Sequence, residues 1–401
     1  MPTFEPFAAL RYCPEAKLDH FLAPPYDVLS DSDISALKLC SPHNIAWVDD
    51  PDESDPDRYA KSAEILTSWI AQGVLVSDPQ PSFTIYRMAF TDATGSSREI
   101  SGVLGGLEVV DEGAGGVLPH ERTTPKASTD RLDLTRATAT NMSPVWGLSL
   151  AQGLTDVLRA PGELLGTLQI EGVTHTVERV SDPVRIQAIQ GVIASGDVLI
   201  ADGHHRYGVS RQYRDEVRAA TGRHDTPAEY TLTFVNELVA SQLSIEAIHR
   251  LYDGVSVEAL RDALSGYFEL APLNADDAPG SHHAPTPETL AQMVQLGRLV
   301  LLHPDGTAEW LTPKPGVFDG VRALDGAWLE HALNSLDAQV TYQHGLAEMK
   351  SVVRQHAAGV LIRPTSLEEI RRTATEGLLM PPKSTFFTPK LLTGFVLRPL
   401  A

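Results

Sequence analysis

Residues 198–207, with the sequence VLIADGHHRY, decide the local fold around which the rest of the chain is arranged. The apolar run from Val198 to Ala201 is typical of a buried strand, and Gly203 permits a tight turn. From residue 207 to residue 220, apolar side chains recur every four positions, which predicts a helix. The stretch therefore predicts a strand, a turn and the beginning of a helix.

Polar side chains are concentrated where this helix is expected to begin. The first turn of a helix has unpaired backbone N–H groups and a partial positive charge. Asp202, Gly203, His204, His205 and Arg206 would lie there, and they are candidates to bind an anion, above all a phosphate group. The alternative is a solvated turn held by structural hydrogen bonds.

The composition limits the possible partners and the compartment. The chain of 401 residues has 52 acidic and 32 basic residues, a formal net charge of −20. An extended basic face for nucleic acid is not expected, so any phosphate ligand should be small. Two cysteines in a long chain predict neither a disulfide framework nor a four-thiolate zinc site. No apolar run approaches 18 residues and no signal sequence stands out, so we expect a cytoplasmic protein without a membrane anchor.

A second motif, LAPPYDV at residues 22–28, contains consecutive prolines. Prolines favour an extended segment, which would present Tyr26 and Asp27 in a fixed orientation. Asp27 is a candidate base or metal ligand, and a turn-forming or capping role is the alternative. Tyr26 is a candidate substrate contact.

A third motif, LPHERTTPKASTDRL at residues 118–132, places His120, Glu121, Lys126 and Arg131 close together in sequence. Such a run is often a solvated loop. A histidine beside a glutamate, followed by spaced basic residues and a helix from about residue 128, is also typical of a loop that supplies a general base and anion contacts.

The C-terminal stretch, MPPKSTFFTPKLLTGFVLR at residues 380–398, reads as a rigid polar arm that enters a final strand. Lys383, Ser384, Thr385 and Lys390 are candidates to reach a phosphate. The alternative is an arm that only closes a sheet.

Periodic patterns of apolar residues predict several other helices and hairpins. Hairpins are expected at 82–110 and 162–180, and helices at 34–39, 59–70, 183–194, 327–336 and 367–374. Residues 272–289 lack periodicity and are expected to form a flexible insertion. The pair His249-Arg250 is either a further phosphate contact or, as we expect, a surface or capping pair.

Four strings in this order resemble the bacterial and archaeal family labelled domain of unknown function 1015. They are residues 24–28, residues 119–132, residues 201–207 and residues 380–390, and the resemblance extends from near residue 5 to the end. The resemblance indicates a family rather than an activity.

The turn at residues 203–207 is also similar to the Gly-Cys-His-Arg-Tyr turn of sulfiredoxin. It resembles the Gly-x-x-Arg turn of ParB-type domains and of the free-serine kinases that share their fold. By position, this resemblance implies a close approach at Gly203 and phosphate contacts from His205 and Arg206. His204 stands where sulfiredoxin has its reactive cysteine, so sulfinic-acid reductase chemistry is not expected.

The resemblance implies a phosphotransferase that acts on a small hydroxylated metabolite, with free L-serine as the best guess. Its donor would be ATP, ADP, pyrophosphate or polyphosphate, with Mg²⁺ bridging donor oxygens. Glu121 or Asp27 would take the acceptor proton, with His204 as a further catalytic candidate. Lys126, Arg131 and Lys383 would neutralise charge or hold a substrate carboxylate, and His120, Ser384 and Thr385 are further substrate contacts.

Two alternatives to this function stay open. One is a non-catalytic protein that senses a nucleotide or phosphate at the same turn. The other is a metal-dependent phosphohydrolase built on His120, His204 and His205, although these residues have no recognisable ligand spacing. The sequence does not determine the oligomeric state.

The expected fold class is α+β, in the sense of a mixed α/β architecture. Residues 1–250 are expected to form a ParB/sulfiredoxin-like phosphate-binding domain, and residues 251–401 a C-terminal α/β domain. The arm at 380–401 is expected to return to the first domain.

Overall fold

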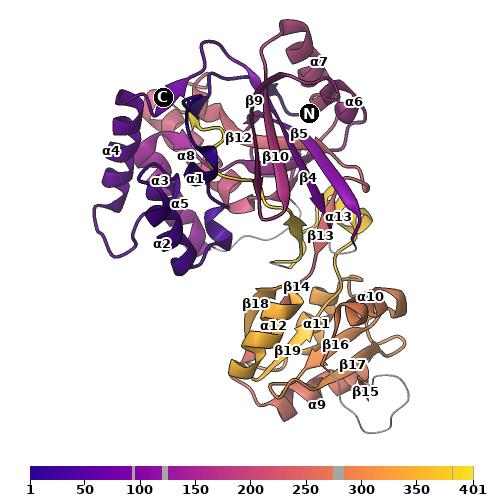
Figure 1. Ribbon diagram of the computed structural model, residues 1–401. Coiled ribbons are helices and arrows are strands. Elements are labelled where there is room, and N and C mark those ends of the chain that lie inside the picture. Colours follow the sequence, from indigo (N-terminus) through magenta and orange to yellow (C-terminus); the bar gives the residue numbers. More distant parts are fainter. Residues whose placement is uncertain (93–94, 120–124, 274–283, 382, 401) are drawn as a thin grey trace. The chain divides into compact units, whose positions relative to one another are not determined.

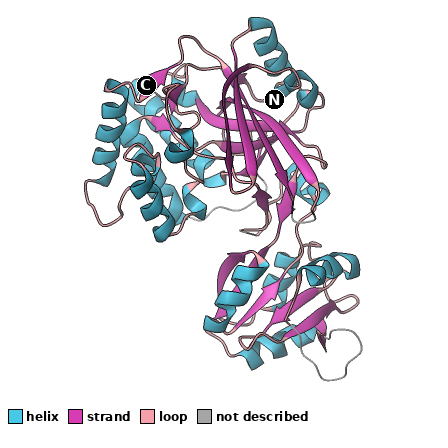
Figure 2. Ribbon diagram, viewed as in Figure 1, coloured by secondary structure: helices cyan, strands magenta, loops and turns pink. Residues whose placement is uncertain are grey.

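The chain folds into two compact units of mixed α/β architecture (Figure 1, Figure 2). The structure is a computed structural model that describes residues 1–400 except 93–94, 120–124, 274–283 and 382. Unit 1 comprises Met1–Ser244, Ala374–Leu378 and Phe387–Ala401, and unit 2 comprises Ile245–Thr373 and Leu379–Phe386. The expected α+β class is confirmed.

Unit 1 is built on a mixed sheet with the strand order β6-β11-β8-β12-β5-β4-β10-β9, to which β1 adds by pairing with β5. Parallel pairs join β11 to β6 and β12 to β8, and the other neighbours are antiparallel. The strands are β1 (Phe4–Glu5), β4 (Phe83–Thr91), β5 (Ser97–Glu108), β6 (Val117–Leu118), β8 (Val145–Ser149), β9 (Glu163–Ile170), β10 (Val173–Val180), β11 (Val198–Asp202) and β12 (Tyr230–Glu237). Two short ladders accompany this sheet: β2 (Leu10–Tyr12) with β3 (Leu75–Ser77), and β7 (Thr140–Asn141) with β21 (Arg398–Pro399).

The helices of unit 1 lie in two groups (Figure 1). Neighbours in the series α3, α4, α5 and α8 pack on one another, and α6 packs on α7. The bounds are α1 (Leu18–Phe21), α2 (Asp31–Cys40), α3 (Ala46–Asp49), α4 (Arg58–Ala71), α5 (Pro125–Thr138), α6 (Leu154–Leu158), α7 (Pro183–Ile193) and α8 (His204–Thr221), with 3₁₀ turns at Tyr26–Val28 and Pro227–Glu229.

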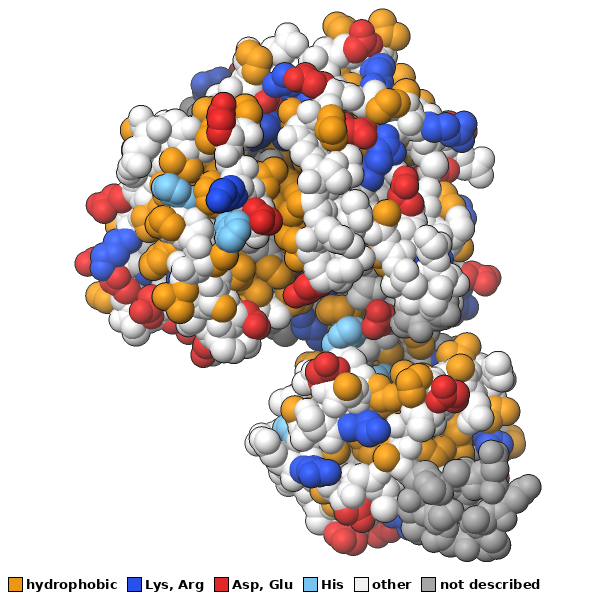
Figure 3. All heavy atoms as spheres, viewed as in Figure 1, with side chains coloured by type: hydrophobic (Ala, Val, Ile, Leu, Met, Phe, Trp, Pro, Cys, Tyr) orange, Lys and Arg blue, Asp and Glu red, His pale blue; other side chains and the backbone are white. Residues whose placement is uncertain are grey.

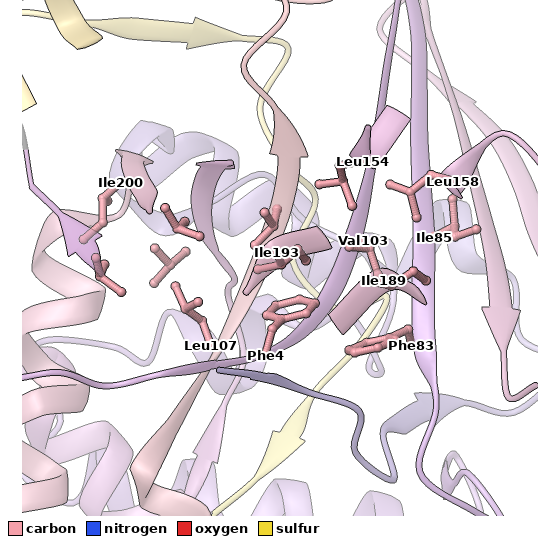
Figure 4. Packing of buried hydrophobic residues seen from close by; sticks show 14 of the residues in the cluster. Phe4, Phe83, Ile85, Val103, Leu107, Leu154, Leu158, Ile189, Ile193 and Ile200 are labelled. Atoms are coloured by element: carbon pink, nitrogen blue, oxygen red, sulfur yellow. The ribbon is translucent and has the colours of Figure 1, made fainter. Parts of the chain in front are cut away.

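The main core of unit 1 lies between the sheet and the pair α6 and α7 (Figure 4). Ile189 and Ile193 of α7 are fully buried there, and the rings of Phe4 and Phe83 stack with centroids 5.1 Å apart. The helix begins sharply because Asp182 accepts a hydrogen bond from the backbone N–H of Arg185 and Pro183 occupies the first turn. This core fixes one side of the sheet.

Strand β11 is apolar over Val198–Ala201 because it lies between β6 and β8, with all four of these residues buried. Asp202, its last residue, is the first polar side chain of the strand and is only partly exposed. The predicted strand is therefore confirmed. The polar cluster begins where the strand leaves the core.

Unit 2 has an antiparallel sheet with helices on both faces, in the order β15-β17-β16-β19-β14-β18. Along β16, Leu299 and Leu301 belong to one hydrophobic cluster and Val300 and Leu302 to another, because successive side chains of a strand point to opposite faces. The elements are β14 (Ile248–Asp253), α9 (Val257–Tyr267), β15 (Phe268–Pro272), α10 (Pro287–Leu296), β16 (Leu299–Leu302), β17 (Ala308–Pro313), α11 (Asp325–Ala332), β18 (Gln339–His344), α12 (Leu346–Val352), a 3₁₀ turn at Val353–Gln355 and β19 (Ala358–Leu361). The remaining elements of the chain are β13 (Ser244–Glu246), α13 (Leu367–Thr375) and β20 (Phe386–Thr388).

The structure confirms both predicted hairpins, as β4–β5 and β9–β10, and corrects some details. His249 and Arg250 are not a surface pair, because they lie in β14 and are both buried. Helix α5 begins at Pro125 rather than near residue 128. Most of the expected insertion at 272–289 falls outside the described residues.

Acidic and basic side chains are interspersed among the described residues on the face drawn in Figure 3. No helix in the described part of the chain is long and apolar enough to cross a membrane.

We predict that His175 makes unit 1 less stable in acid. Its side chain is buried, with 2% of the residue exposed, and its Nδ1 lies 2.7 Å from Tyr86 Oη. Burial lowers the pKa of His175 from 6.5 to about 4, so the unfolded chain binds a proton more readily than the folded chain. The contribution of neutral His175 to the unfolding free energy is fully present above pH 6.5 and is lost as the pH falls toward 4. Between pH 4 and pH 6.5, the unfolding free energy of a His175→Gln protein should therefore change less with pH than that of the wild-type protein. The difference in slope should be up to about 1.4 kcal/mol per pH unit.

Urea unfolding at a series of pH values measures this dependence. His224→Gln, at an exposed position, is the matched control and should keep the wild-type slope. An unchanged slope in His175→Gln would contradict the assignment.

Candidate functional site

The turn between β11 and α8 positions the candidate site. Gly203 adopts a left-handed conformation with φ of 84°, and α8 begins at the next residue and continues for 18 residues. The helix thus begins three residues earlier than the predicted start at residue 207. His204 and His205 lie in its first turn, and both are partly buried. The unpaired N–H groups of this turn and the helix dipole favour an anion in front of it.

Arg206 folds back beneath the turn instead of extending in front of it. Its Nη2 donates a hydrogen bond to Asp202 Oδ2 at 2.9 Å, and its Nη1 donates to the carbonyl oxygen of Pro144. Burial would lower the pKa of Arg206, but the charges of Asp202 and Asp27 outweigh this effect and raise it. In this structure Arg206 holds the turn, and its predicted phosphate contact stays a prediction.

Gly203 is required for two reasons. Its positive φ disfavours other residues. In addition, a Cβ atom at this position would lie 3.0 Å from both Cζ and Nε of Arg206. A side chain at 203 would therefore require the Arg206 guanidinium, which hydrogen bonds hold in place, to shift by a few tenths of an ångström.

Lys390 brings the terminal arm to the same carboxylate. Its Nζ lies 3.5 Å from Asp202 Oδ1, and the Lys390 side chain is 14% exposed. Asp202 thus lies between two cations, one from α8 and one from the arm. Of the four arm residues predicted as phosphate contacts, Lys390 belongs to unit 1 with the turn.

Tyr26 and Asp27 lie in a 3₁₀ turn, which follows the extended Pro25, rather than in an extended segment throughout. Burial raises the pKa of Tyr26 to about 12, and the guanidinium of Arg131 lies over its ring, 4.3 Å from the centroid. Asp27 is exposed, and its charge acts on the pKa values of both Tyr26 and Arg206. An exposed carboxylate therefore lies near the turn.

Arg131 is held by its neighbour Asp130 on α5 and by Asp49 of α3. Its Nε donates to Asp130 Oδ2 at 2.8 Å, and its Nη1 donates to the carbonyl oxygen of Asp49 at 2.6 Å. Asp49, at the end of α3, also accepts a hydrogen bond from Ser143 Oγ at 2.9 Å. The sequence analysis missed Asp49 and Ser143, for which the adjacent Asp49-Asp50 pair is the only local signal.

Asp49 and Asp50 are adjacent carboxylates. Burial and the neighbouring charge of Asp49 together raise the pKa of Asp50 to about 7. Lys38 donates a hydrogen bond to the carbonyl oxygen of Asp50. The carboxylate atom Oδ2 of Asp50 has no hydrogen-bond partner among the described residues. Asp49 is consequently the carboxylate of the pair that Ser143 and Arg131 engage.

A small polar cavity of about 50 Å³ joins these groups behind the turn. Three predicted site residues, Tyr26, Arg131 and Arg206, meet at it, together with the unpredicted Asp49. The other lining residues are Leu134, Thr135, Thr140, Asn141, Met142, Ser143, Val209, Ser210 and Thr231.

The side chains of the remaining predicted site residues either lie outside the described part of the chain or belong to unit 2. His120 and Glu121 lie outside the described residues. Lys126 lies in the first turn of α5, but its side chain is also outside the description. Lys383, Ser384 and Thr385 belong to unit 2, where Ser384 is buried and its Oγ donates to the carbonyl oxygen of Pro381 at 2.7 Å. Within the described ranges, no group of three or more His, Cys, Asp or Glu side chains could hold a metal ion.

Comparison with known proteins places the chain in a family. The family model described as "Protein of unknown function (DUF1015)" matches residues 4–337, so the chain belongs to that family. No curated protein matches the sequence.

Several solved structures are distantly similar. A free serine kinase in complex with AMP is 10% identical, with 68% of this chain and 84% of that chain covered and a TM-score of 0.37. SbnI with a C-terminal truncation, from Staphylococcus aureus, is 14% identical, with coverages of 74% and 87% and a TM-score of 0.39. A conserved hypothetical protein from Pyrococcus furiosus is 10% identical, with coverages of 68% and 87% and a TM-score of 0.36. TM-scores below 0.5 do not establish a shared fold or activity.

We predict that Gly203→Ala destabilises the protein more than Gly222→Ala does. Both glycines flank α8 with positive φ, 84° and 69°, so the methyl group costs about 1–2 kcal/mol of backbone strain at each position. Gly222 has open space around it, whereas Gly203 faces the Arg206 guanidinium. Urea unfolding, followed by amide hydrogen exchange in β11 and α8, measures the difference.

Equal losses of stability in the two variants would contradict the packing role of Gly203. A larger loss at Gly203, with faster exchange at the first turn of α8, is the expected result.

Proposed function

We propose that this member of the DUF1015 family is a cytoplasmic phosphotransferase that moves a phosphoryl group from a nucleotide or polyphosphate donor to the hydroxyl group of a small metabolite. The best candidate acceptor is free L-serine, as the similarity of the turn to that of the free-serine kinases implies. One observation carries the proposal: Tyr26 lines the same cavity as Arg206 of the anion-binding turn, and the next residue in the chain, Asp27, has an exposed carboxylate. Phosphoryl transfer needs both groups at one place.

The donor phosphates would bind in front of α8. The N–H groups of its first turn, with the side chains of His204 and His205, supply hydrogen bonds to phosphate oxygens. Lys390 supplies a positive charge at the same place, since its Nζ lies beside Asp202. Arg206 keeps Gly203 and Asp202 in position and is a positioning residue in this proposal.

A carboxylate near the donor would accept the proton of the acceptor hydroxyl group. A bond then forms between the acceptor oxygen and the terminal phosphorus, while the bond from that phosphorus to the bridging donor oxygen breaks. The proton passes to the carboxylate and the leaving phosphate takes the bond electrons. Asp27 is the described candidate for this base, and Glu121 remains a second candidate from the sequence.

The residues present fit a magnesium ion that is bound largely through the donor. Mg²⁺ keeps several waters and needs only one or two carboxylates besides phosphate oxygens, so the absence of a three-ligand cluster in the described part of the chain agrees with this mode. Asp27 is an exposed carboxylate that could hold the ion, and in that case Glu121 would be the base. When bound, the ion would neutralise charge on the donor oxygens.

The test is a phosphorus NMR screen of the purified protein with Mg²⁺, each of the four donors and a panel of amino acids and polyols. We expect turnover with at least one pair. Binding of a nucleotide without turnover for any pair would contradict the proposal and favour the alternative, a nucleotide or phosphate sensor.

We predict that Asp27→Asn lowers kcat by about 10²- to 10⁴-fold, because a general base contributes on this order. Asp31→Asn, a nearby exposed carboxylate at the beginning of α2, is the matched control and should keep the wild-type rate. If Asp27→Asn and Glu121→Gln both kept wild-type kcat, neither carboxylate would be the base.

A further inference from the structure

The cavity behind the turn contains groups of both charge signs. Arg131 and Arg206 line it, and so does the carboxylate of Asp49. All three side chains are largely buried, with exposures of 11% for Arg131, 9% for Arg206 and 6% for Asp49. A ligand that enters the cavity therefore meets two guanidinium groups and one carboxylate at short range.

The charges around the cavity are already balanced. Arg131 contacts Asp130 at 2.7 Å, and Arg206 contacts Asp202 at 2.9 Å. A phosphate dianion would find no excess positive charge here and would face Asp49 as well. A ligand with one negative and one positive group matches the arrangement better, because it brings no net charge into a buried site.

Two hydrogen-bonding groups at the cavity have no partner among the described residues. Asn141 Oδ1 accepts a hydrogen bond from the backbone N–H of Leu232 at 3.0 Å, while no described group accepts from its Nδ2. The hydroxyl group of Tyr26 likewise forms no hydrogen bond to the described part of the chain, although its ring is held against Arg131. Both residues are only partly buried, so water or a polar ligand in the cavity can contact these two groups.

The size of the cavity limits that ligand. Each water needs roughly 10–15 Å³ of such volume, so a cavity of about 50 Å³ holds roughly the non-hydrogen atoms of glycine, and a small side chain would extend through its open side. Nucleotides and large side chains are too big, since pockets for ligands of that size are about 300–1,000 Å³. Leu134, Met142 and Val209 make part of the wall apolar.

We propose that this cavity is a binding site for a zwitterionic amino acid with a small side chain. The ligand carboxylate lies toward Arg131, Arg206 and the Tyr26 hydroxyl group, and the ligand ammonium group lies toward Asp49. The binding claim stands on the cavity alone. The further claim that the bound amino acid is the phosphoryl acceptor rests on the proposed function.

Isothermal titration of the full chain, without any phosphate donor, tests the binding claim. Glycine, L-alanine and L-serine should bind, and propionate, ethylamine and inorganic phosphate should bind at least about tenfold more weakly, because each lacks one of the two charged groups or carries the wrong charge. L-Leucine should also bind more weakly because of its volume. Failure of all three small amino acids to bind, or competition by phosphate at equal concentration, would overturn the proposal.

Tyr26→Phe localises the site. It removes the hydroxyl group but keeps the ring beneath Arg131, so the protein should fold normally and bind L-alanine about 2- to 12-fold more weakly, as expected for one lost hydrogen bond. Tyr213→Phe, the same change on α8 away from the cavity, is the matched control and should bind as wild type. Equal affinity in both variants would place the amino acid elsewhere.

Binding and turnover can fail separately. Amino-acid binding that Tyr26→Phe weakens, without phosphoryl transfer from any donor, would support the cavity site and contradict the proposed function. Phosphoryl transfer to a polyol, without amino-acid binding, would support the proposed function and contradict the cavity site.

Discussion

The ion pair between Asp202 and Arg206 beneath Gly203 is the interaction on which the site depends. It fixes the last residue of β11 against the first turn of α8, and it keeps the backbone at Gly203 in the left-handed conformation. The Arg206 side chain is 9% exposed, so removal of Asp202 would leave its charge with little access to water, a change that typically costs about 3–5 kcal/mol. The anion-binding end of α8 and the wall of the cavity both follow from this pair.

Arg206 separates two surfaces of different chemistry. In front of the turn lie the N–H groups of α8, the two histidines and Lys390, which together favour a phosphate. Behind it lies the cavity, in which each guanidinium group is already balanced by a carboxylate. A phosphate donor and a small acceptor can therefore be recognised by different groups around one turn, as transfer between two substrates requires.

Local patterns in the sequence predict the strand at 198–201, the hairpins and the anion turn, because each depends on neighbouring residues. They do not predict the direction of Arg206, which depends on the carbonyl oxygen of Pro144, 62 positions away. Asp49 and Ser143 are not predicted for the same reason, since Asp49 lies 82 positions from Arg131 and 94 positions from Ser143. His249 and Arg250 look like a polar surface pair, but strand pairing on both sides buries them.

A crystal structure with a non-hydrolysable ATP analogue, Mg²⁺ and L-serine would test the central claim most directly. Our account predicts a phosphate group at the first turn of α8, an amino acid in the cavity and Arg206 still paired with Asp202. A nucleotide bound away from α8, or an Arg206 side chain that leaves Asp202 to contact the phosphate, would contradict it.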